Sequence, residues 1–388
     1  MLNFEFYNPT RVVFGKGTLP KLDKLVPAEA NVLITYGRGS AKKSGLIDKV
    51  KTILVNRKIQ EFGGIEPNPR YETLLKALEI VRKEKIDFLL AVGGGSVIDG
   101  TKFIGLSSCY ERDPSDLFKY CQKPIPLEFV NKTMPLGTVL TLPAAGSEMN
   151  ECAMISYQQR KCCVLTEVLF PKFSILDPTL TFTLPRIQVA NGVIDTFVHT
   201  TEQYLTYPVG GKLQDRLAEG ILQTLIEVGK TTVNEPENYE ARANLMWCAT
   251  VAVNRIMGVG VPQDWATHMI GHEITVLCGI DHGQTVGIVL PALLKVRRQK
   301  KQAKLLQYAE RVWHINKGSE KEKIDLAIEK TREFFESLGV KTRLSEYGVG
   351  ADKIPLLVEQ LKIHGMVNLS ETEDQTLDIS QKILEQAF

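Results

Sequence analysis

The chain has almost no net charge and no long apolar run. Its 47 Lys and Arg residues are balanced by 45 Asp and Glu residues, for a formal net charge of +2, so we expect neither nucleic acid nor a membrane surface as a partner. No segment approaches the ~18 consecutive apolar residues of a membrane span, and the first residues lack the basic-then-apolar order of a secretory signal. These absences predict a cytoplasmic protein.

The chain also lacks the C-x-x-C spacing of structural zinc sites. Its cysteines are odd in number and two are adjacent, so we expect reduced, mostly buried thiols. Cys278 lies four residues before His282, but its glycine-containing surroundings favour a small buried residue over a metal ligand. The seven cysteines are Cys109, Cys121, Cys152, Cys162, Cys163, Cys248 and Cys278.

A length of 388 residues suggests two or three domains, and the sequence pattern changes near residue 183. Before that point, apolar runs at 31–36, 59–62 and 87–92 each precede a turn and a helical pattern, which predicts a parallel α/β sheet. After it, helical patterns cover 188–204, 212–232, 239–257, 264–275 and 302–314. We therefore expect an α/β domain over 1–182 and an all-α domain over 183–388. The basic run at 295–304 is interpreted as a solvated helix face.

Four of the six histidines fall in short segments of the second domain. Asp195-x-x-x-His199 and His268-x-x-x-His272 each place two side chains one helical turn apart on the same face. Asp281-His282-Gly283 follows soon after. Carboxylate with imidazole suits Fe(II) or Zn(II). The spacing predicts one metal ion held by an acid and three or four histidines.

A glycine-rich turn, Gly93-Gly94-Gly95-Ser96, separates an apolar run from a helical pattern in the first domain. Glycine lets the backbone approach a ligand closely, and the N-terminus of a helix favours an anion such as a pyrophosphate. The turn is not the G-x-G-x-x-G fingerprint, and a tight turn without a ligand would look the same. The loop at 36–43 has no acid, which favours NADP(H), although a solvated basic turn has a similar composition. Its polar residues are Arg38, Ser40, Lys42 and Lys43.

Together these motifs resemble the iron-containing (group III) alcohol dehydrogenases from end to end. The sequence is most similar to the branch of NADP-dependent butanol dehydrogenases and broad-range aldehyde reductases. One stretch, Leu142-Pro-Ala-Ala145, departs from the threonine-rich segment usual in the family. The segments that carry the resemblance are Phe14-Gly-Lys-Gly17, Glu66-Pro-Asn-Pro69, Gly93-Gly-Gly-Ser-Val-Ile-Asp99, Thr138-Val-Leu-Thr-Leu-Pro143, Gly146-Ser-Glu-Met-Asn150, Asp177-Pro178, Asp195-x-x-x-His199, Val261-Pro-Gln-Asp-Trp-Ala-Thr-His268-x-x-x-His272 and Asp281-His282-Gly283.

The resemblance implies a dehydroquinate synthase-like fold and a homodimer. The first domain would bind NADP(H), with NAD(H) as an alternative, and the helical domain would bind one divalent metal, Fe(II) or Zn(II). His272 would carry a proton. By matched position, the metal ligands would be Asp195, His199, His268 and His282. The cofactor contacts would be Gly39, Ser40, Asn68, Gly94, Gly95, Ser96, Asp99, Thr138, Thr141 and Lys161.

We therefore predict an NADP-dependent alcohol dehydrogenase or aldehyde reductase for short-chain substrates such as butanol and butanal. The metal would polarise the substrate oxygen during hydride transfer. The alternatives are a glycerol-type polyol dehydrogenase that uses NAD and a metallohydrolase that activates water with the same ligands. A dehydroquinate synthase-like lyase is disfavoured, because the metal segment is flanked by apolar Trp265, Met269 and Ile270 rather than by Lys and Arg.

Overall fold

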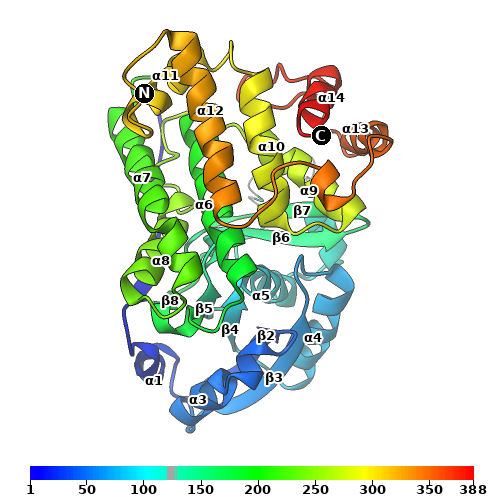
Figure 1. Ribbon diagram of the computed structural model, residues 1–388. Helices are drawn as coiled ribbons and strands as arrows, with labels where there is room; N and C mark the ends of the chain where they lie inside the picture. Colours follow the sequence, from blue (N-terminus) through cyan, green and yellow to red (C-terminus); the bar gives the residue numbers. More distant parts are fainter. Residues whose placement is uncertain (120–126, 128) are drawn as a thin grey trace. The chain divides into compact units, whose positions relative to one another are not determined.

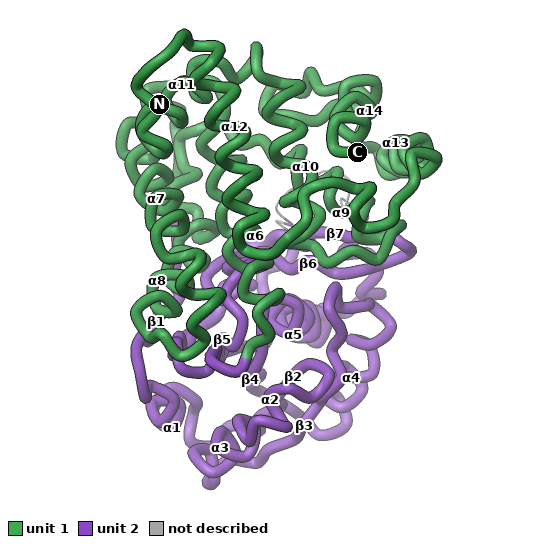
Figure 2. Tube along the Cα trace, in the orientation of Figure 1, with its two compact units in different colours: residues 1–6, 184–388 green, residues 7–183 purple. Residues whose placement is uncertain are grey.

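The computed structural model describes residues 1–119, 127 and 129–388 (Figure 1). Cys121 lies outside the described residues. The described chain groups into two compact units, which Figure 2 colours separately. One unit comprises Tyr7–Thr183, and the other comprises Leu184–Phe388 together with Met1–Phe6. The first residues are held in the second unit because the Leu2 amide donates to the Gly260 carbonyl at 2.9 Å.

The α/β unit contains a six-stranded sheet with strand order β1-β8-β5-β4-β2-β3. Every neighbouring pair in it is parallel. The central strands β2 and β4 are buried over nearly their whole length, as their apolar runs predict, because a parallel sheet is normally covered on both faces. The strands are β1 (Arg11–Phe14), β2 (Asn31–Gly37), β3 (Lys58–Ile65), β4 (Phe88–Gly94), β5 (Leu136–Leu142) and β8 (Phe173–Leu176).

Helices connect these strands, as the alternating pattern predicts. Helix α5 follows β4 without an intervening residue, and its side chains from Val97 to Ser107 are buried, so it packs in the interior of the unit. The helices are α1 (Leu22–Leu25), α2 (Ser40–Lys43), α3 (Leu46–Ile53), α4 (Tyr71–Lys83) and α5 (Gly95–Ser108). Short 3-10 turns are η1 (Leu19–Lys21), η2 (Pro114–Phe118), η3 (Ser147–Met149), η4 (Glu167–Leu169) and η5 (Pro178–Thr181).

A separate antiparallel hairpin is formed by β6 (Cys152–Tyr157) and β7 (Arg160–Leu165). Its two-residue turn, Gln158 and Gln159, has positive φ at both positions, 47° and 59°. The sequence did not indicate this hairpin turn, because glutamine is not one of the usual residues of such turns. Cys162 is disulfide-bonded, so the expectation of reduced thiols was wrong for this residue. The free cysteines are Cys109, Cys152, Cys163, Cys248 and Cys278.

The second unit is helical, and the predicted fold class is confirmed. Helix α6 is buried from Val189 to Tyr204, and its apolar side chains belong to one large hydrophobic cluster. Within the described chain, no helix is both long and apolar enough to cross a membrane. The helices are α6 (Arg186–Tyr204), α7 (Lys212–Asn234), α8 (Tyr239–Ala252), α9 (Ala266–Cys278), α10 (His282–Val296), α11 (Gln302–Arg311), α12 (Glu320–Ser337), α13 (Lys353–Ile363) and α14 (Leu377–Gln386), with the 3-10 turn η6 (Ser345–Tyr347).

The basic run at 295–304 is not a solvated helix face, so that interpretation was wrong. The Lys301 side chain is 2% exposed, and its ammonium lies 2.8 Å from Asp264 and 3.0 Å from Glu371. Lys304 pairs with Asp215, and Arg297 pairs with Asp374. A cation can be buried when it has charged partners, and the sequence alone did not reveal these acids because they lie far away along the chain.

Candidate metal and cofactor sites

The helical unit brings the predicted metal ligands together from three helices. Asp195 and His199 lie one turn apart on α6, His268 lies on α9, and His282 is the first residue of α10. The start of α10 approaches α6 closely, because a Cβ at Gly283 would lie 2.7 Å from the backbone oxygen of Asn191. Only glycine permits this approach, which explains the residue after His282.

The Asp195 carboxylate is the centre of the cluster. Its Oδ1 lies 3.7 Å from His199 Nδ1, 3.6 Å from His268 Nε2 and 3.8 Å from His282 Nε2. Single ligand atoms of Asp195, His268 and His282 all lie within 4.8 Å of one another. These separations are too long for hydrogen bonds, but they suit atoms that each lie about 2.0–2.2 Å from one shared ion.

Several polar atoms of the cluster are buried without a hydrogen bond. Among the residues that the structure describes, Asp195 Oδ1, His199 Nδ1 and His268 Nε2 have no hydrogen-bond partner. Buried polar groups are nearly always satisfied, and the exceptions call for an explanation such as an ion. The donor set, one carboxylate and several imidazoles, therefore fits a divalent transition metal.

The charges of the cluster oppose the effect of burial. Burial alone would raise the pKa of Asp195, but the neighbouring imidazoles of His199, His268 and His282 hold it well below its usual range. Burial lowers the pKa of His199 to about 4, so this ring is neutral and can act as a ligand. Burial also lowers the pKa of His268, but Glu202 and Asp195 overcome this and raise it to about 9.

Glu202 is a candidate functional residue that the sequence analysis missed. Its carboxylate accepts hydrogen bonds from the Thr267 amide at 2.7 Å, from the His268 amide at 3.2 Å and from His268 Nδ1. A carboxylate that engages one ring nitrogen fixes the tautomer and leaves the other nitrogen for a metal. Glu202 follows Asp195 and His199 at the i, i+4, i+7 positions of one helical face, and this spacing could have revealed it.

His272 lies beside the cluster, one turn after His268 on α9. Its ring centre is 5.0 Å from that of His282 and 6.1 Å from that of His268, and the residue is 8% exposed. The next residue, Glu273, pairs with buried His364 at 2.8 Å. His364 is therefore structural and links α9 to the end of α13, whereas His314 is exposed.

In the α/β unit, the glycine turn joins β4 directly to α5. A Cβ at Gly93 would lie 2.5 Å from Val97, and a Cβ at Gly95 would lie 2.8 Å from the Ala145 Cβ. Packing alone thus excludes larger residues at these two positions. Gly94, Gly95 and Ser96 are half-buried at the N-terminus of a 14-residue helix, where backbone N–H groups can hold an anion.

The Asp99 carboxylate binds the chain segment that leads into β6. Its carboxylate accepts hydrogen bonds from the Ser147 hydroxyl at 2.5 Å and the Met154 amide at 3.1 Å. Lys102, one turn later on α5, is fully buried and donates to the Asn150 side chain at 2.9 Å and to the carbonyls of Asn150 and Cys152. These two residues therefore hold the segment from Ser147 to Met154 against α5.

The other predicted cofactor contacts differ in accessibility. Thr138 is fully buried and its hydroxyl donates to Ser174 at 2.8 Å, whereas Thr141 is half-buried. The backbone amide of Asn68 donates to the Ser96 hydroxyl at 3.2 Å, so Asn68 lies beside the glycine turn. Lys161 lies on β7 and its charge acts on Asp99.

The loop after β2 presents Gly39 and Ser40 at the start of α2. Gly39 has φ 119°, a conformation that favours glycine. Lys42 is not available as a free cation, because it lies 3.2 Å from Glu61 and donates to Tyr36. Arg38 and Lys43 are exposed, and neither has an ion pair within the described chain.

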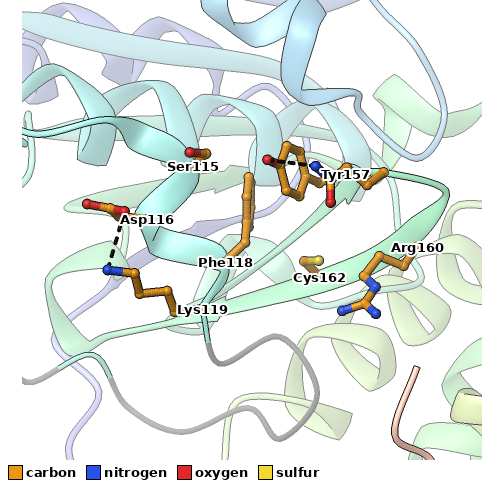
Figure 3. Close-up of a pocket in the computed structure, with 8 residues that line it drawn as sticks. Ser115, Asp116, Phe118, Lys119, Tyr157, Arg160 and Cys162 are labelled. Carbon is orange, nitrogen blue, oxygen red and sulfur yellow. Dashed lines mark hydrogen bonds and ion pairs between the residues drawn. The ribbon is translucent and has the colours of Figure 1, made fainter. Parts of the chain in front are cut away.

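A cavity of about 240 Å³ lies elsewhere in the α/β unit, beside η2 and the turn of the β6–β7 hairpin (Figure 3). Phe118 and Tyr157 stack there with ring centres 4.7 Å apart. The cavity is lined by Ser115, Asp116, Phe118, Lys119, Tyr157, Gln158, Arg160 and Cys162. None of the predicted site residues lines it, so we assign it no part in the candidate site.

Comparison with known protein families covers nearly all of the chain. Residues 9–178 match the family described as iron-containing alcohol dehydrogenase. Residues 189–388 match the C-terminal family of Fe-containing alcohol dehydrogenases.

The individual relatives are named as aldehyde reductases or alcohol dehydrogenases. The chain is 54% identical to the NADPH-dependent aldehyde reductase YqhD of Escherichia coli, with 100% of both chains covered. It is 39% identical to the NADH-dependent butanol dehydrogenase A of Clostridium acetobutylicum, with 93% of this chain and 93% of that protein covered. The crystal structure of E. coli K-12 YqhD matches with a TM-score of 0.96 over 100% of this chain and 99% of that chain, at 53% identity. The NADH-dependent butanol dehydrogenase A of Thermotoga maritima matches with a TM-score of 0.92 at 33% identity, over 100% of this chain and 99% of that chain.

Proposed function

The chain belongs to the iron-containing alcohol dehydrogenase family, and on this premise we propose that it is a metal-dependent aldehyde reductase that uses NADPH. Its substrates would be short-chain aldehydes such as butanal, and the corresponding alcohols in the reverse direction. The observation that carries the proposal is the buried group of Asp195, His268 and His282, whose ligand atoms lie within 4.8 Å of one another. Residues 1–182 would bind the cofactor and residues 183–388 the metal.

We propose Asp195, His199, His268 and His282 as the ligands of one divalent metal. The proposal is supported by the distances of 3.6–3.8 Å around Asp195 Oδ1 and by the buried atoms that lack hydrogen bonds within the described chain. Glu202 would hold His268 with Nε2 directed to the ion. Whether iron or zinc is preferred depends on metal supply as well as on this ligand set.

We propose that the glycine turn holds the cofactor pyrophosphate. Gly94, Gly95 and Ser96 offer backbone N–H groups at the start of α5, with Asn68 fixed beside them. Asp99, Thr138, Thr141 and Lys161 would line the nicotinamide side, with Asp99 and Thr138 acting through the segments that they hold in place. At the adenosine end, Gly39 and Ser40 leave room for a 2′-phosphate, and Arg38 and Lys43 supply positive charge. This arrangement favours NADPH over NADH.

When bound, the metal would polarise the substrate oxygen and the reduced nicotinamide would supply the hydride. The chain's own residues provide the remaining steps. Asp195 supplies the negative charge of the ligand set, and Glu202 fixes the orientation of the His268 ring. His272, whose ring centre is 5.0 Å from that of His282, delivers the proton that the product alcohol requires. The Trp265 ring, whose centre lies 5.6 Å from that of His268, would limit access of water.

An NADPH-oxidation assay with butanal tests this proposal. We expect turnover with NADPH that depends on a bound metal, and a slower reaction with NADH. The Asp195→Asn, His268→Ala double variant should lose turnover and metal, while its affinity for NADPH, measured by nucleotide fluorescence, stays within about twofold of the parent. Unchanged turnover in that variant would contradict the metal assignment.

Two further properties are proposed. We propose a cytoplasmic location, as expected from the sequence, and a homodimer, which the family resemblance alone supports. Light scattering on the purified protein tests the homodimer. The alternative is a glycerol-type dehydrogenase that uses NAD. Its cofactor, but not its substrate, has support from a relative at 39% identity that is named as an NADH-dependent butanol dehydrogenase. Comparison of butanal with dihydroxyacetone as substrate, each with NADPH and NADH, distinguishes the two.

A further inference from the structure

Two free cysteines of the β6–β7 hairpin are in contact. Cys152 begins β6, Cys163 lies on β7, and their sulfur atoms are 2.7 Å apart. Non-bonded heavy atoms normally lie about 3.5–4.0 Å apart, so the two side chains already point directly at each other. Neither residue belongs to the proposed metal or cofactor machinery.

The register of the hairpin explains this contact and sets Cys162 apart. Met154 lies opposite Cys163, and Ile155 lies opposite Cys162. Because side chains alternate along a strand, Cys152 and Cys163 share one face and Cys162 projects from the other. Cys162 is fully buried and lines the cavity of Figure 3. The adjacent cysteines thus have different surroundings.

The backbone around Cys152 is held in position. Its amide donates to Asn150 Oδ1 at 3.1 Å, and its carbonyl accepts from Lys102 at 2.9 Å. Both cysteines are half-buried. The contact with Cys163 and burial raise the pKa of Cys152 well above its ordinary range. Cys152 therefore stays a thiol, and we assign the attack on an oxidant to the Cys163 sulfur.

We propose that Cys152 and Cys163 form a redox-reactive dithiol that hydroperoxides convert to an intramolecular disulfide. The Cys163 thiolate attacks the peroxide O–O bond, becomes a sulfenic acid and releases one water or alcohol. The Cys152 sulfur then displaces the sulfenic hydroxyl, which leaves as water. The two thiols lose two electrons and two protons in total, and the peroxide takes up both. A dithiol reductant reverses the reaction.

The inference goes beyond the proposed function and does not depend on it. The bond would join β6 to β7 beside Lys102 and Asp99, which hold the segment between η3 and β6. Oxidation would therefore fix one edge of the candidate cofactor site. In a reducing compartment such disulfides are transient and are typical of redox-responsive proteins.

Peptide mapping of the full-length protein tests the proposal. The reduced protein is treated with hydrogen peroxide, remaining thiols are alkylated, and the digest is analysed by mass spectrometry without reduction. We expect a peptide that links Cys152 to Cys163, loss of these two thiols beyond any thiol lost to the disulfide of Cys162, and recovery of both with dithiothreitol. The Cys162→Ser variant should keep the linked peptide, because in it Cys163 alone of the adjacent pair can react.

The Cys163→Ser variant should lose the linked peptide, and Cys152→Ser should do the same if the first variant does not fold. Cys109→Ser is a matched control outside the hairpin and should behave like the parent. Persistence of the Cys152 and Cys163 thiols after peroxide treatment would overturn the proposal. So would a link from Cys152 to Cys162, or a Cys163 oxidised to sulfinic acid beside an unmodified Cys152.

Discussion

Glu202 accepts hydrogen bonds from His268 at both the backbone amide and the ring Nδ1. The two residues lie on different helices, α6 and α9, and both are almost fully buried. One carboxylate therefore fixes the start of α9 and the direction of the His268 ring. The proposed metal site depends on this pair as well as on its ligands.

Glu202→Gln should weaken metal binding while the protein stays folded. The amide keeps the size of the side chain but not its charge. Loss of such a partner typically lowers metal affinity by about 10–100-fold. Competition against a chromophoric chelator measures the affinity. Glu219→Gln, which removes another buried carboxylate of the same unit, is the control. Equal retention of metal by Glu202→Gln and the parent would show that Glu202 has no such role.

Arg38→Ala and Lys43→Ala should each raise KM for NADPH by about tenfold and leave KM for NADH unchanged. Each side chain is exposed and without an ion pair in the described chain, so its charge is available to a 2′-phosphate. A contact of about 1.4 kcal/mol corresponds to a factor of ten. Lys49→Ala, on the exposed side of α3, is the matched control. A parallel change with both nucleotides would argue against a role in cofactor choice.

Lys301→Met should destabilise the helical unit by about 3–5 kcal/mol, because it leaves the buried carboxylates of Asp264 and Glu371 without their shared cation. Denaturant unfolding measures the change. Lys300→Met is the control, since Lys300 is 69% exposed and pairs with Asp374 only at the surface. That change should cost less than about 1 kcal/mol. Similar losses for the two variants would refute the assigned role of the Lys301 pairs.

Gly95→Ala should weaken nucleotide binding, whereas Gly220→Ala should raise the stability of the helical unit. A Cβ at Gly95 would lie 2.8 Å from the Ala145 Cβ, so the turn must shift and nucleotide binding should weaken. A Cβ at Gly220 meets nothing within 4 Å on exposed α7, so the helix should gain about 0.5–1 kcal/mol. Nucleotide titration and thermal unfolding measure the two effects. Normal NADPH affinity in Gly95→Ala would show that the turn does not hold the cofactor.

The sequence predicted the fold class and the family, and both were confirmed. Local patterns were sufficient for the helix expected after the run at 59–62, which is α4, and for the i, i+4 pairs on α6 and α9. Contacts between distant segments were not predictable. Lys301 pairs with Asp264, and Lys102 donates to Asn150, only after the fold has brought distant parts of the chain together. The ligand assignments themselves stay predictions, since spacing shows which residues can meet but not what they bind.

Metal removal tests the central proposal most directly. The freshly purified protein is analysed for its elements, stripped with a chelator and assayed for NADPH oxidation with butanal before and after metal is returned. We predict about one Fe or Zn per chain, loss of turnover on stripping and recovery with about one equivalent of divalent metal. Full turnover of the metal-free protein would contradict the account.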